Sequence, residues 1–285
     1  VGYGEVNTLD HVLFFTTQGT YGYTPVYDVE ESRWKEIGSH INSTIRISGE
    51  EKITDAFVLR SFATNAYMIS VTKNGLVKKT AVREYEVSRN NKTMSNMKLL
   101  DGDAVVKTMV AYAYDEILIA SKNGFVSRYP VSLIPETSPR SKGVKAMNLV
   151  LDEIVSACIS HGDASQLIVF TDQCQMKRIK LSDVDVTGRP TKGSMICKKV
   201  KSKPYQIAHI ALHDLNDELV IINEETQKIL AKDISLMSKD ATFSSPLHTT
   251  QDYYFLRTLA AVEQRELPAI QEEKQEFEEI ELFED

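Results

Sequence analysis

The chain has 285 residues, 42% of them hydrophobic, and a formal net charge of −7. That length allows one large domain or two ordinary ones, and no apolar run reaches the about 20 residues that a membrane-spanning helix needs. The first residues do not resemble a secretory signal, and the three cysteines (Cys158, Cys174 and Cys197) fit no metal-binding spacing. We therefore expect a reduced, cytoplasmic protein.

One sequence pattern recurs along the chain. In Glu116–Glu136 an apolar strand runs into a turn at Asn123-Gly124, and a second strand follows that starts apolar and becomes basic. Asn-Gly favours a tight hairpin because both residues tolerate a positive φ. Further copies begin at His11, Tyr67, Gln166 and Glu218, the last being the most degenerate. The turn positions of the five copies are Gly19, Gly75, Gly124, Cys174 and Thr226.

The spacing of these copies predicts the fold class. The turn positions are 56, 49, 50 and 52 residues apart, and a period near 50 with two strands per copy predicts an array of β units. A polar connector and another apolar strand follow each hairpin, which gives about four strands per unit once the strand-like parts of the connectors are counted. We predict an all-β, propeller-like domain over residues 1–262, with blade repeats near 11–59, 67–110, 116–159, 166–212 and 218–262. No hairpin copy precedes Asp10, so we expect a fragment of a longer protein that has lost an earlier repeat.

The negative charge is concentrated at one end of the chain. Residues 263–285 contain ten acids and two bases, so the rest of the chain carries about one positive charge. Within it, residues 177–203 hold nine bases and two acids. We expect the acidic tail to be disordered, and either to solvate the chain end or to compete with nucleic acid for the basic residues.

The sequence contains none of the common catalytic or nucleotide-binding motifs that we sought, such as GxSxG, HExxH, GxxxxGK[ST] or a strand-following GxGxxG. His209 and His213 are four residues apart but fall in or just after an apparent strand, so a metal pair is not expected. We therefore predict no catalytic residue, metal or cofactor in this chain.

The bases recur at equivalent places, after the hairpin turns and in the connectors. Around a disc such positions follow one curved rim, and a curved basic rim can bend a DNA duplex by neutralising its phosphates. The alternative for any single lysine is that it protects an exposed strand edge and keeps the protein soluble. The candidate DNA-binding residues are Lys73, Lys78, Lys79, Arg83, Lys122, Arg128, Arg140, Lys142, Lys145, Lys177, Arg178, Lys180, Arg189, Lys192, Lys198 and Lys199.

The hairpin segments VTKNGLVKKT, ASKNGFVSRYPVSLIPE and FTDQCQMKRIKLSDV resemble the C-terminal domain of the A subunit of bacterial type IIA topoisomerases, which are DNA gyrase and topoisomerase IV. The resemblance covers nearly all of residues 10–262. It implies a six-bladed β-pinwheel whose blades exchange strands and whose rim binds and bends double-stranded DNA. It also implies that the catalytic tyrosine lies in another domain, and that ATP and Mg²⁺ act elsewhere in a heterotetramer of A and B subunits.

Two short segments favour topoisomerase IV over gyrase. Arg33–Gly38 and Gly143–Leu149 look more like the topoisomerase IV A subunit of Gram-positive bacteria, and no QRRGGKG-type box of gyrase occurs in the chain. The resemblance thus implies a non-catalytic module, in the bacterial cytoplasm at the nucleoid, that presents DNA for relaxation and decatenation. The alternatives are the DNA-wrapping domain of gyrase and a propeller-like scaffold for protein interactions.

Overall fold

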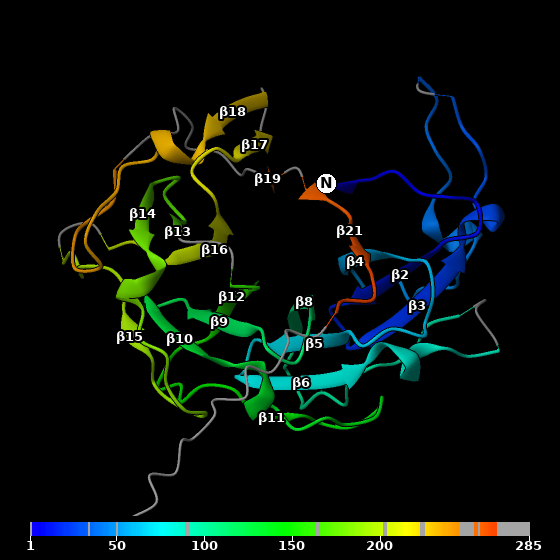
Figure 1. Ribbon diagram of the computed structural model, residues 1–285, viewed down its shortest axis with the longest axis horizontal. Helices are drawn as coiled ribbons and strands as arrows, with labels where there is room; N and C mark the ends of the chain where they lie inside the picture. The colour runs from blue at the N-terminus through cyan, green and yellow to red at the C-terminus, as the bar shows by residue number, and fades with distance from the viewer. Residues whose placement is uncertain are drawn as a thin grey trace, which may run out of the picture.

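A computed structural model describes residues 2–33, 35–49, 51–88, 92–162, 166–201, 204–222, 226–244, 254–255 and 257–266. The described part is an all-β arc of five repeats that follow one another around a centre (Figure 1). This confirms the predicted fold class. Trp34 and residues 267–285, which form most of the acidic tail, lie outside the described residues.

Each repeat begins with an antiparallel hairpin. The hairpin strands are β2 (His11–Thr16) with β3 (Thr20–Pro25), β5 (Tyr67–Thr72) with β6 (Leu76–Ala81), β9 (Glu116–Ser121) with β10 (Phe125–Pro130), β13 (Gln166–Thr171) with β14 (Met176–Lys180), and β17 (Glu218–Ile222) with β18 (Thr226–Leu230). Thr226 was expected at a turn but is the first residue of β18. Glu116 pairs with Pro130 whereas Glu218 pairs with Leu230, so the fifth hairpin is two residues shorter than the third.

A short 3₁₀ helix follows each hairpin, and another lies in the first connector. They are η1 (Val26–Asp28), η2 (Ile41–Ser43), η3 (Val82–Tyr85), η4 (Val131–Leu133), η5 (Leu181–Asp183) and η6 (Ala231–Asp233). An inner strand then pairs with the first strand of its own hairpin on the side of the arc's centre. These inner strands are β4 (Ile53–Leu59), β8 (Val105–Ala111), β12 (Ile154–Ser160), β16 (Ile207–His213) and β19 (Tyr254–Phe255).

The fourth strand of a blade comes from the following repeat. The connectors contain β7 (Met94–Ser95), β11 (Val144–Lys145) and β15 (Ser194–Met195), which pair with β3, β6 and β10 of the repeat before them. Ser244 makes the corresponding bridge to Met176 on β14. The connectors therefore form the outer edge of the arc, and the strand exchange that the resemblance implied is present.

The apolar runs of the hairpins are explained by burial on both faces. Ile117 and Ile119 of β9 pack with Ile69 of the second repeat, whereas Leu118 of the same strand packs with Leu167 of the fourth. Successive side chains of a strand point to opposite faces, so each hairpin contributes to two cores. This is why the sequence shows continuous apolar runs rather than alternation.

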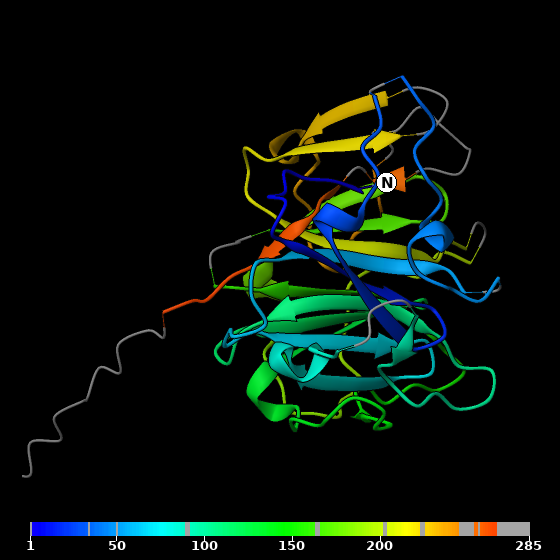
Figure 2. The ribbon, with the colours of Figure 1, turned by 90° about the vertical axis from the view of Figure 1, so that its right-hand side faces the viewer.

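The two ends of the described chain meet at the first repeat. Strand β21 (Ala260–Val262) runs parallel to β4, and β20 (Arg257–Thr258) pairs with β1 (Gly2–Tyr3). The residues after β21 bind the second repeat, since the hydroxyl of Tyr112 donates a 2.8 Å hydrogen bond to the Glu263 carbonyl. The C-terminal segment thus joins the fifth repeat to the first two across the opening of the arc (Figures 1 and 2).

Candidate nucleic-acid interface

The structure separates the predicted DNA-binding residues into groups with different surroundings. Lys78 and Lys177, both predicted as DNA contacts, are 1% and 0% exposed. Each is the third residue after its hairpin turn, and the side chain of Lys177 points beneath the connector of the next repeat. Their ammonium groups have no path to a phosphate in this conformation, so the sequence pattern alone misplaced them at the surface.

Lys177 binds the connector of the fifth repeat. Its Nζ donates to the carbonyls of Ser238 at 3.2 Å, Lys239 at 3.0 Å and Ala241 at 2.9 Å, and it lies 5.0 Å from the centre of the Phe243 ring. Burial lowers its pKa to about 8 because the charged form loses its hydration. Three carbonyl acceptors compensate for part of that loss.

Lys78 has fewer partners than Lys177. Its Nζ donates to the hydroxyl of Thr80, and burial alone lowers its pKa to about 8. The surroundings are polar rather than charged, because Tyr85 and Asn96 are joined nearby by a 2.7 Å hydrogen bond. Burying the charged form of Lys78 therefore lowers the stability of the folded protein.

Three further predicted bases bind the next repeat along the chain. Lys79 donates to the Val131 carbonyl at 3.3 Å, Arg128 donates to the Leu181 carbonyl at 2.9 Å, and Arg178 donates to the Ile234 carbonyl at 3.1 Å. Arg128 also forms an ion pair of 2.6 Å with Glu116. These side chains lie at junctions between repeats and are not free for DNA.

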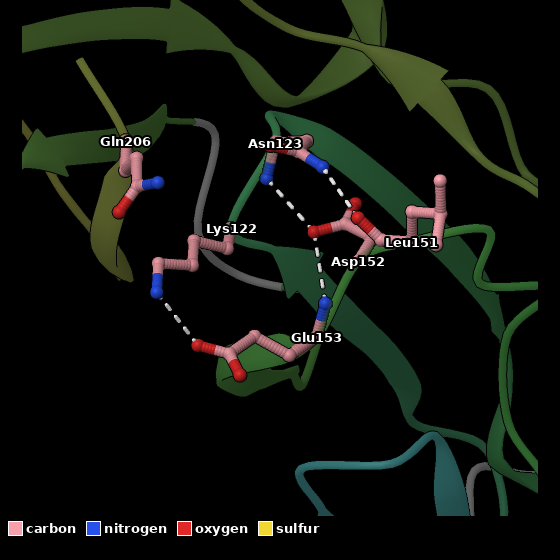
Figure 3. A pocket seen from close by; sticks show the side chains of 6 residues that line it. All are labelled: Lys122, Asn123, Leu151, Asp152, Glu153 and Gln206. Carbon is pink, nitrogen blue, oxygen red and sulfur yellow. Dashed lines mark hydrogen bonds and ion pairs between the residues drawn. The ribbon is translucent and has the colours of Figure 1, made fainter.

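Lys73 and Lys122 are ion-paired with one carboxylate. Glu153 accepts from Lys122 at 2.8 Å and from Lys73 at 2.9 Å, and Lys122 lines a shallow polar depression beside Asn123 and Asp152 (Figure 3). Both contacts lower the pKa of Glu153, and the contact with Lys122 has the larger effect. The charges of Lys73 and Lys122 are partly neutralised by Glu153, which makes these two lysines weaker candidates for phosphate contact than unpaired bases.

Arg83 is likewise paired, with Glu136 at 3.2 Å, whereas Lys180 is exposed on the surface at the end of β14. Arg189 is half-buried and donates to the carbonyls of Leu133 and Lys145 at 3.1 and 2.7 Å. It holds one connector against another.

The remaining predicted bases lie together on the connectors. We call residues 92–99, 137–149 and 187–201 the connector belt. Backbone hydrogen bonds join each belt connector to the next: Lys98 to Ser141 at 3.0 Å, Asn148 to Thr191 at 2.8 Å, and Lys198 to Ala241 of the fifth repeat at 3.4 Å. The belt is therefore continuous along the outer edge of repeats two to four.

The belt is strongly basic. Its three segments contain ten bases and no acid, and none of the ten forms a salt bridge with another described residue. Nine are exposed and Arg189 is half-buried. The ammonium groups of Lys192 and Lys199 lie 4.5 and 5.9 Å from the ring centre of Phe125, the first residue of β10. The ten are Lys92, Lys98, Arg140, Lys142, Lys145, Arg189, Lys192, Lys198, Lys199 and Lys201.

Three of these bases, Lys92, Lys98 and Lys201, were not among the predicted DNA contacts. Lys98 occupies the same place as Asn148 and Lys198 in the two following repeats, since the backbone N–H of each binds the next connector. That equivalence was hidden because Lys98 is 23 residues after its hairpin turn and the other two are 24 residues after theirs, and because the second connector lacks the Lys-Gly pair that the third and fourth share.

Comparison with known proteins agrees with this geometry. The family model described as DNA gyrase C-terminal domain, beta-propeller, matches residues 10–60, 66–111, 115–161 and 165–214. The chain belongs to this family. The match omits the fifth repeat, which is the most degenerate in sequence and has the shortest hairpin.

Relatives in the family are parts of topoisomerases. The A subunit of DNA topoisomerase 4 from Bacillus subtilis is 30% identical over 79% of this chain, and that from Staphylococcus epidermidis is 28% identical over 87%. The chain spans 27% and 31% of their lengths. The solved C-terminal domain of DNA topoisomerase IV superposes with a TM-score of 0.80 at 30% identity, covering 86% of this chain and 76% of that one. The DNA gyrase A C-terminal domain superposes with a TM-score of 0.74 at 18% identity, covering 88% and 83%.

The described part of the chain contains neither a group of side chains suited to a metal ion nor a membrane-spanning helix. No three His, Cys, Asp or Glu side chains among those residues are grouped so that they could hold a metal ion. No helix there is long and apolar enough to cross a membrane.

Proposed function

We propose that this chain is a non-catalytic DNA-binding and DNA-bending module of a type IIA topoisomerase, belonging to the A subunit of topoisomerase IV. The connector belt carries the proposal, because ten bases without an acid follow one continuous outer edge. In a full enzyme the module would present duplex DNA to the cleavage core for relaxation and decatenation during chromosome segregation. Its partners would be the rest of the A subunit, together with the ATPase-bearing B subunit of the heterotetramer, in the bacterial cytoplasm.

The physical basis is the neutralisation of phosphates. Duplex DNA carries one charge per about 1.7 Å, and each neutralised phosphate releases counterions, so log Kobs falls with log salt by about 0.9 per contact. The bases are spread over three repeats of an arc, so a duplex can contact all of them only if it curves along the arc. The contacts therefore offset the elastic cost of bending, which is of order 1–6 kcal/mol for a short site. Nothing in the belt is a helix that could enter the major groove, so binding is expected to be largely independent of sequence.

The test is a salt titration with two matched double variants. We expect K198Q/K199Q to bind all duplexes more weakly and to reduce the salt slope by about 1.8. The control, K52Q/K232Q, removes two exposed lysines outside the belt that form no salt bridge with another described residue, and it should leave the slope unchanged.

Two outcomes would contradict the proposal. Equal loss in both variants would mean that general positive charge, not the belt, governs binding. Absence of salt-dependent binding by the unaltered chain would favour the scaffold for protein interactions.

The gyrase domain is the second candidate within the family, because its solved form is 18% identical to this chain, against 30% for topoisomerase IV.

A further inference from the structure

In four repeats the residue four positions after the hairpin turn donates a hydrogen bond to a backbone carbonyl of the next repeat. Lys79 and Arg128 each donate to the carbonyl of the first residue of the 3₁₀ helix of the next repeat, and Arg178 donates to the carbonyl of the residue just after that helix. In the first repeat this position is Tyr23, whose hydroxyl donates to the Val87 carbonyl just beyond η3. We call these four residues the junction donors.

The first residue of each hairpin holds its junction donor. Arg178 donates to Gln166 at 3.1 Å, Arg128 pairs with Glu116, and Lys79 lies 5.1 Å from the centre of the Tyr67 ring. In the first repeat the rings of His11 and Tyr23 are 5.6 Å apart. The chemistry of the supporting residue changes from repeat to repeat while its place in the hairpin does not.

The neutral Tyr23 shows which property this position requires. A phosphate contact needs positive charge, whereas donation to a neighbouring carbonyl needs only reach and a hydrogen-bond donor. All four junction donors meet the second requirement and only three meet the first. The common property is therefore donation across the junction between repeats.

We propose that the junction donors are positioning residues that hold each repeat against the next and so set the curvature of the connector belt. The inference rests on the proposed function, since it assigns the belt to DNA. The fourth junction is the clearest case. Arg178 binds Ile234, and its neighbour Lys177 binds three carbonyls of residues 238–241. Ala241 in that segment also accepts from the backbone of Lys198 in the belt.

The experiment uses the half-buried Arg178 so that the variant folds. We expect R178Q to leave the salt slope of DNA binding unchanged. We also expect it to change the end-to-end energy transfer of a doubly labelled duplex at saturation, and to speed amide hydrogen exchange in β17 and β18 at least 10-fold without DNA. R178K should keep both readouts at their wild-type values, because a lysine at the equivalent position of the second repeat donates to a carbonyl of the next repeat. K198Q/K199Q is the control, with a lower slope and unchanged exchange.

Three results would overturn the inference. A slope lowered by about 0.9 in R178Q, with unchanged exchange, would make Arg178 a direct phosphate contact. Faster exchange with unchanged energy transfer would mean that the junction holds the fifth repeat without shaping the belt. Failure of R178K to restore exchange would mean that donation across the junction is not the required property. If the unaltered chain bound no DNA, the proposed function would fail and the exchange data alone would still decide whether the junction donor acts.

Discussion

Replacing Lys78 by methionine should stabilise the protein near neutral pH. The side chain is 1% exposed, Thr80 is its hydrogen-bond partner, and its pKa is lowered from 10.5 to about 8 by burial. A difference of about 2.5 pKa units corresponds to a cost of about 3 kcal/mol at pH 7 for keeping the ammonium charged in the folded state. Methionine fills similar volume but loses one hydrogen bond, which costs about 1 kcal/mol. The net gain at pH 7 is therefore about 2 kcal/mol.

The pH dependence provides the critical measurement. Between pH 8 and 10.5 the unfolded wild-type chain binds more protons at Lys78 than the folded chain does, so the stability of the wild type relative to Lys78→Met rises with pH in this window. The advantage of the variant should fall to near zero by about pH 9.5. Denaturant unfolding of both proteins at several pH values measures it. A variant that is less stable at pH 7, or that lowers the salt slope of DNA binding by about 0.9, would refute the assignment of Lys78 as a buried base that does not touch DNA.

Two further changes test other parts of the fold. Gly193→Ala should destabilise the protein by about 2 to 3 kcal/mol, because φ is 82° and an added Cβ would stand 2.5 Å from the Val126 carbonyl oxygen. Gly188→Ala is the control, because a Cβ there meets nothing within 4 Å, and it should have little effect on the thermal midpoint. Tyr112→Phe should cost about 1 kcal/mol and speed amide exchange at Val262, because it removes the bond to Glu263 and keeps the ring beneath Arg265. Tyr114→Phe, an exposed neighbour, is its control, and equal effects of the two changes would show that the C-terminal segment is not held by Tyr112.

Much of the fold was accessible from the sequence because its signals are local. Asn123-Gly124 predicts a hairpin, and the spacing of five such turns predicts an array of β units. The hairpins at Glu116 and Gln166 are found where the pattern placed them. Thr226 was misplaced because the fifth hairpin is two residues shorter and lacks a glycine at its turn.

The candidate site was only partly accessible. The bases Arg140, Lys142, Lys145, Lys192, Lys198 and Lys199 were selected from the sequence and are exposed on the belt. Lys78 and Lys177 were selected by the same rule and are buried, since two adjacent bases on a strand point to opposite faces and both faces of these blades are covered. Sequence position cannot distinguish a base that faces solvent from one that faces the next repeat.

The sequence by itself determined the elements of this protein: hairpins, turns, a period near 50 residues and connectors rich in bases. These depend on backbone preference, side-chain alternation and composition, all of which act over a few residues. Only the tertiary structure decided which repeat receives each connector strand and which bases remain free. Lys177 and Lys198 carry the same charge and both were selected as DNA contacts, but one is enclosed by three carbonyls of the next repeat and the other is exposed on the belt. That difference arises from the exchange of strands between repeats, a long-range contact that no local signal encodes.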